Sequence, residues 1–117
     1  MAGLNCGTVS PAAWPAVSRA FDAFCAIDDA DAEDGMRSLA AIGLDAGACA
    51  GAALGAACRL LTGPDSESTR RLLGVEPDAH VLVLLTEGVT DPEHFESTVG
   101  RATNTSRGDG LHATSHA

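Results

Sequence analysis

A threonine, a glutamate and a glycine follow directly after a run of bulky apolar residues late in this sequence. The run extends from Val81 to Leu85, and Thr86, Glu87 and Gly88 come next. Open α/β sheets bind ligands beyond the carboxyl ends of their strands. A threonine hydroxyl at such a place can bond a ring nitrogen or a phosphate, and a glycine lets a ligand approach the backbone. Thr86 and Gly88 form the candidate binding site, although a plain turn after a strand would use the same residue types.

The cysteines, histidines and clustered carboxylates indicate no metal site. Cysteines 6, 25, 49 and 58 contain no CxxC pair, and no histidine lies at ligand spacing from two of them. Cys6 and Cys49 have no adjacent base, which favours inert thiols over reactive ones. His112 and His116 have the i, i+4 spacing of a metal pair, but they lie in a polar tail. The acidic run 28–34 lacks the pattern of a calcium loop and is typical of a helix's first turn.

Composition limits the classes of function. The 117 residues suffice for one domain, but only 3% are aromatic, so we expect a thin core. The net charge is −9, which disfavours nucleic acid as a partner. All seven basic residues are arginines, so the chain has no lysine for a Schiff base with a carbonyl cofactor. The N-terminus lacks a signal-peptide pattern, and we expect a cytoplasmic protein with reduced thiols.

Start and stop signals predict the elements that must position the candidate site. Aromatic and aliphatic residues at helical spacing predict a helix over 14–27. Capping residues, glycines and prolines predict four further helices. The first covers 28–41 and stops near Gly43, and the second covers 45–63 with Asp45 as its cap. The third covers 65–74 and ends at Gly74, and the last runs for about two turns from its cap, Asp91. The continuous valines and leucines of 80–85 predict a strand that is covered on both faces.

The third predicted helix carries Gly47, Gly51 and Gly55 on one face. Each interior glycine costs about 0.5–1 kcal/mol relative to alanine, so we expect the backbone to approach a neighbouring element or a ligand closely. Small residues at this spacing also pair membrane helices. Asp45 and Arg59 bracket a stretch shorter than the ~20 residues of a membrane span, however. We therefore predict a helix that packs against a sheet, with no membrane contact.

One strand among several helices has nothing to pair with. Either the helix predictions are wrong, or the strand belongs to a sheet whose other members lie elsewhere. We favour the second interpretation. The fold class predicted from the sequence is α/β, mostly helical, with one core strand.

Four segments together resemble a known enzyme family. They are MAGLNCGTVSPAAWP, EDGMRSL, the helix that contains CAGA, and LLTEGVTDPEHF, which occur in this order within about residues 1–96. They resemble the C-terminal portion of diaminopropionate ammonia-lyase, a fold type II pyridoxal-phosphate enzyme related to threonine dehydratase and tryptophan synthase β. The resemblance implies a partial tryptophan synthase β-like domain over 1–99, and we expect a disordered tail over 100–117.

The resemblance also implies a reaction. Family members hold pyridoxal phosphate on a lysine, remove the α-proton of 2,3-diaminopropionate and eliminate its β-amine, which yields pyruvate and ammonia. In related enzymes a serine or threonine at the end of a late strand faces the pyridine nitrogen. Thr86 matches that place, and Gly88 lies beside it. The AGLNCG loop over 2–7 resembles family sequence near the active site.

The departures from the family pattern decide what the chain can do alone. The lysine and the glycine-rich phosphate loop are missing, and the Gly-Glu-Ser-Gly-Ala run of the family is replaced by Ala-Cys-Ala-Gly-Ala over 48–52. We therefore predict no catalytic residue and an inactive chain, unless the missing N-terminal portion or a homo-oligomer partner completes the site. Two alternatives stay open, a small helical interaction module without cofactor and one half of a split pyridoxal-phosphate enzyme.

Overall fold

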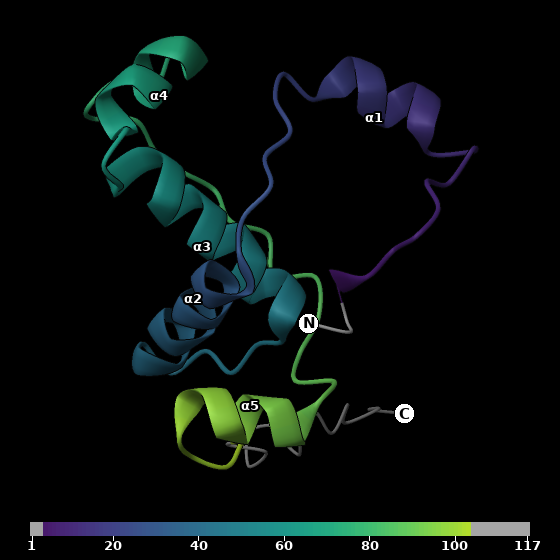
Figure 1. Ribbon diagram of the computed structural model, residues 1–117, viewed down its shortest axis with the longest axis vertical. Helices are drawn as coiled ribbons and strands as arrows, with labels where there is room; N and C mark the ends of the chain where they lie inside the picture. The colour runs from purple at the N-terminus through teal and green to yellow at the C-terminus, as the bar shows by residue number, and fades with distance from the viewer. Residues whose placement is uncertain (1–3, 104–117) are drawn as a thin grey trace, which may run out of the picture.

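The computed structural model describes residues 4–103 and contains five helices (Figure 1). In chain order they are α1 (Trp14–Ala20), α2 (Asp29–Ala41), α3 (Ala48–Thr62), α4 (Ser66–Leu73) and α5 (Pro92–Val99). Helices α2 and α3 pack against each other, α4 continues from the end of α3, and α5 packs on α2. The described residues are therefore mostly helical, as predicted.

Glycines allow the backbones of α2 and α3 to touch. A Cβ atom added to Gly35 would overlap the carbonyl oxygen of Gly51, and one added to Gly55 would overlap the carbonyl oxygen of Asp31. A Cβ atom at Gly51 would clash with the side chain of Met36. The close backbone approach predicted for the glycine face is confirmed. The predicted partner was wrong, because α3 packs on a helix and not on a sheet.

The core is small and lies where α2, α3 and α5 meet. Its first cluster contains Met36, Ala40 and Phe95, against which the half-buried Ala48, Val89 and Val99 pack. A second cluster, formed by α2, α3 and the residues just before α3, consists of Leu39, Ala46 and Ala50. Phe95 and Met36 are the largest fully buried side chains of the described range. Full burial of such a side chain contributes about 1.5–3 kcal/mol, so these two residues dominate a core made mostly of alanine.

Several helix boundaries follow the local signals in the sequence. Helix α2 is followed by Gly43 and α4 by Gly74, both in the left-handed region with φ of 82° and 66°. Asp91 caps α5, since its side chain accepts a hydrogen bond of 3.0 Å from the backbone amide of His94. These ends agree with the prediction to within a residue or two. The reason is that cap and stop signals act over one helical turn.

Helix α1 is shorter than predicted and has no buried residue. It ends at Ala20 instead of reaching residue 27, and Phe21 already has an extended backbone. In Figure 1, α1 lies apart from the other helices, so no packed partner supports a longer amphipathic helix. Trp14, Phe21 and Phe24 instead contact one another, with ring centroids 6.2 Å apart for Trp14–Phe24 and 5.8 Å apart for Phe21–Phe24.

The strand predicted over 80–85 is absent, since residues 4–103 contain no strand. The segment runs as a tube from α4 back along α3 toward α5 (Figure 1). The described residues give it no neighbouring strand, and a strand exists only by pairing. Leu82 is 83% exposed and Leu84 is 66% exposed. The apolar run is thus present but uncovered, and the described residues do not show the strand that was expected to be buried on both faces.

The expected cap of α3 was also wrong. The N-cap residue is Gly47, whereas Asp45 pairs with Arg101 beyond the end of α5. A second Arg101 contact is a hydrogen bond of 3.3 Å to the carbonyl oxygen of Ala40, at the end of α2. The guanidinium carbon of Arg101 also lies 5.8 Å from the centre of the Phe95 ring. Arg101 therefore joins the end of α5 to the connection between α2 and α3.

Two further predictions concern the ends of the chain and the membrane. His112 and His116 lie outside the described residues, as does most of the tail expected from residue 100. Within 4–103, no helix combines the length and the apolar character that a membrane crossing requires.

Candidate functional site

The candidate site lies where residues 86–89, called the TEG loop below, cross the N-terminus of α3. The backbone amide of Cys49, in the first turn of α3, donates a hydrogen bond of 3.3 Å to Oε1 of Glu87. A Cβ atom at Gly47 would lie 2.8 Å from that same oxygen and 2.7 Å from the carbonyl oxygen of Gly88. The TEG loop thus reaches its place only because position 47 has no side chain.

Exposure alternates along the TEG loop. Thr86 and Gly88 are exposed, whereas Glu87 and Val89 are half-buried. Successive side chains of an extended segment point to opposite sides. Glu87 and Val89 accordingly face the helices, with Val89 packed against the cluster of Met36, Ala40 and Phe95. Thr86 and Gly88, the two site residues predicted from the sequence, both lie on the open side of the loop, and a Cβ at Gly88 would meet no atom within 4 Å.

The N-terminus of α3 already has an anion. Unpaired amides and the helix dipole make a helix N-terminus favourable for negative charge. Asp45 precedes this helix end in the sequence, but it pairs with Arg101. The Glu87 carboxylate lies at the amide of Cys49 instead. Sequence reasoning named Thr86 and Gly88 and assigned no role to the glutamate between them. The sequence did contain a signal for this role. Neighbouring side chains of an extended segment point to opposite sides, so Glu87 faces the protein when Thr86 faces outward.

The Glu87 carboxylate interacts with the thiol of Cys49 as well as with its backbone amide. A side-chain hydrogen bond to Glu87 is the main cause that raises the pKa of Cys49, and burial raises it further. The negative charges of Glu87 and, to a smaller extent, Cys6 act in the same direction. A raised pKa keeps the thiol protonated at neutral pH, and the thiolate is the reactive form. The geometry at Cys49 therefore belongs to a structural thiol and not to a nucleophile.

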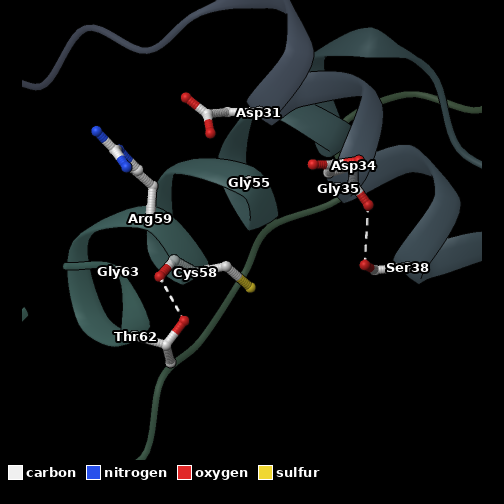
Figure 2. A pocket seen from close by; sticks show the side chains of 9 residues that line it. All are labelled: Asp31, Asp34, Gly35, Ser38, Gly55, Cys58, Arg59, Thr62 and Gly63. Carbon is white, nitrogen blue, oxygen red and sulfur yellow. Dashed lines mark hydrogen bonds between the residues drawn. The ribbon is translucent and has the colours of Figure 1, made fainter.

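A second candidate is the hollow between α2 and the C-terminal half of α3 (Figure 2). It has a volume of about 180 Å³. Its two hydroxyls are used locally, since Ser38 donates to the carbonyl oxygen of Asp34 and Thr62 to that of Cys58, each at 2.8 Å. Asp34 is paired with Arg37. The two hydroxyls and the Asp34 carboxylate of the hollow thus bond within their own helices.

Known proteins support the resemblance predicted from the sequence. The chain is 34% identical over 104 residues to diaminopropionate ammonia-lyase of Escherichia coli (strain K12), an alignment that covers 85% of this chain and 26% of that protein. It is 32% identical over 105 residues to diaminopropionate ammonia-lyase of Salmonella typhimurium (strain LT2), with the same coverage. The chain spans about a quarter of the length of these curated relatives.

The other comparisons add no relative. No family model matches the chain, and no solved structure matches it significantly. The resemblance to diaminopropionate ammonia-lyases is confirmed by sequence over most of the chain, and the site must be interpreted with that family in view.

Proposed function

We propose that this chain, which is similar to diaminopropionate ammonia-lyases over most of its length, forms the C-terminal portion of a fold type II pyridoxal-phosphate enzyme. The enzyme would eliminate ammonia from 2,3-diaminopropionate and release pyruvate. The observation that carries the proposal is the 34% identity over 85% of the chain. Thr86 and Gly88 are its site residues in this proposal, and residues 1–99 form part of a tryptophan synthase β-like domain.

The uncovered apolar run supports a larger assembly. Val81, Leu82, Leu84 and Leu85 are between 42% and 83% exposed. Within 4–103, no backbone–backbone hydrogen bond involves residues 80–90. A segment of valine and leucine with free backbone groups is a template for strand pairing. We propose that it becomes a strand of a parallel sheet whose other strands are provided by the rest of the enzyme, which would place Thr86 at its carboxyl end.

We propose that Thr86 and Gly88 of the TEG loop would hold one edge of the cofactor. Thr86 offers an exposed hydroxyl, and the space around Gly88 is open. The chain has no lysine, so the covalent attachment has to come from another part of the enzyme. When bound, pyridoxal phosphate supplies an electron sink for removal of the α-proton. The contribution of this chain is to orient: the Thr86 hydroxyl bonds the ring nitrogen, and Gly88 admits the ring close to the backbone.

Complementation tests the proposal. This chain would be co-expressed with a polypeptide that carries the remaining three quarters of the Escherichia coli enzyme. We expect the complex to retain pyridoxal phosphate after dialysis and to release pyruvate from 2,3-diaminopropionate, whereas this chain alone does neither. The C-terminal quarter of the Escherichia coli enzyme serves as the positive control. Restoration by that control but not by this chain would contradict the proposal, as would retention of the cofactor by this chain alone.

A self-contained helical interaction module without cofactor is the second candidate. The observation in its favour is that the described elements are all helices, three of which close around Phe95 and Met36. Such a module would melt cooperatively as a monomer. A chain with an uncovered apolar run would instead melt broadly or self-associate. Circular dichroism during heating, combined with sedimentation, separates the two candidates.

A further inference from the structure

We infer that Glu87 is a positioning residue, which fixes the neighbouring Thr86 hydroxyl by holding the TEG loop on the N-terminus of α3. The inference rests on the proposed function, because it is the proposed cofactor contact of Thr86 that Glu87 would position. It assigns a role to a residue that bonds no cofactor itself.

The first support is the set of contacts that Glu87 makes. Its Oε1 atom accepts the backbone amide of Cys49 at 3.3 Å, and the same oxygen would lie 2.8 Å from a Cβ atom at Gly47. The carboxylate therefore fills the space that the missing Gly47 side chain leaves. Residues 49 and 87 are far apart in sequence, so this contact fixes a loop on a helix that is not its neighbour along the chain.

The second support is that Thr86 has no anchor of its own. It is exposed, and no hydrogen bond holds its side chain within the described range. Its place is set by the residues that follow, of which Glu87 binds the end of α3 and Val89 packs in the core cluster. An exposed hydroxyl next to an anchored carboxylate is what a site requires when one residue orients and the next one contacts the ligand.

The electrostatics favour the same arrangement. A carboxylate at the first turn of a helix accepts a charge-assisted hydrogen bond and complements the helix dipole. A glutamine at position 87 would keep the acceptor oxygen without the charge, whereas an alanine would remove both. The two variants therefore separate the hydrogen bond from the charge.

The first experiment uses the isolated chain and needs no cofactor. In Glu87→Ala we expect hydrogen exchange at the Cys49 amide to accelerate about fivefold, which corresponds to the loss of a typical N-terminal capping contact. The NMR order parameter of the Thr86 methyl group should fall at the same time. In Glu87→Gln, the exchange rate of the Cys49 amide and the order parameter of the Thr86 methyl group should stay close to those of the unchanged chain. Glu96→Ala removes an exposed carboxylate on α5 and should change neither. An unchanged Thr86 methyl in Glu87→Ala overturns the inference.

The second experiment uses the complemented enzyme and monitors the absorbance spectrum of the bound cofactor. Thr86→Val removes the proposed hydroxyl and should shift the spectrum. Glu87→Ala should reproduce that shift. The double variant should shift the spectrum no further than either single variant, because both substitutions act through one contact. A shift with Thr86→Val but none with Glu87→Ala overturns the positioning role and leaves the proposed function intact. No shift with Thr86→Val contradicts the cofactor contact itself.

Discussion

The guanidinium of Arg101 donates two hydrogen bonds to the carboxylate of Asp45, a residue 56 positions earlier in the chain. One of them, from Nη1 to Oδ2, is 3.1 Å long. Paired bonds of this kind have a fixed geometry that a lysine cannot reproduce. They connect the end of α5 to the segment between α2 and α3, and Phe95 lies beneath the guanidinium.

We expect Arg101→Ala to lower the melting temperature of the chain and Arg101→Lys to restore only part of it. The physical reason is that Asp45 would lose both bonds while its side chain is only 14% exposed. Arg71→Ala is the matched control, since its ion pair with Glu67 has side chains that are 78% and 85% exposed. Equal melting temperatures for Arg101→Ala and Arg71→Ala would show that the Arg101–Asp45 pair stabilises the chain no more than the exposed Arg71–Glu67 pair does.

Gly51→Ala should destabilise the chain by about 1–3 kcal/mol, the range for an overpacked interior. A new Cβ would meet the carbonyl oxygen of Ala32 and the side chain of Met36, and these contacts outweigh the helix propensity that alanine gains. Urea denaturation measures the change. Gly7→Ala adds the same methyl group where no atom lies within 4 Å, so its effect should stay near zero. A stabilised Gly51→Ala would mean that α2 and α3 do not touch.

Cys49 should react slowly with iodoacetamide, and Glu87→Gln should accelerate the reaction. The hydrogen bond and charge of Glu87 raise the pKa of Cys49, so losing the charge lowers the pKa and increases the thiolate at pH 8. A chain with Cys49 as its single thiol makes the rate readable. Because the folded state favours the neutral thiol, this contact stabilises the fold at neutral pH, and the contribution is lost as the pH rises through the raised pKa. The same rate in both chains would contradict the contact.

His94 offers a case in which a polar group can be removed at no cost. Its Nε2 atom is buried and has no hydrogen-bond partner within residues 4–103. An unpaired buried polar atom costs about 1–3 kcal/mol, so His94→Leu should leave the free energy of unfolding unchanged or raise it. Phe95→Ala, at the next position, should lower it by about 3–5 kcal/mol. A large loss of stability in His94→Leu would show that Nε2 has a partner after all.

The sequence was informative where structure depends on neighbours along the chain. Gly43, Gly74 and Asp91 end or begin helices where predicted, because each acts within one turn. The predictions failed where a distant residue decides. Asp45 was expected to cap α3, but Arg101 pairs with it. The strand over 80–85 needed a partner that the described residues do not supply.

The candidate site also contains residues that the sequence could predict and one that it could not. Thr86 and Gly88 could be named from residue type and from their place after an apolar run. The role of Glu87 could not, because it depends on a bare glycine at position 47, whose importance appears only when the two segments are brought together. No local rule connects these positions.

The separation of α1 from the core has a practical consequence for optical work on this polypeptide. Trp14 is the only tryptophan, and it is 47% exposed beside Phe24. The fluorescence emission of Trp14 therefore reports on its own surroundings and does not change when the helices around Phe95 separate. A blue shift of that emission on mixing with another polypeptide would register burial of the aromatic face, without any label having been attached.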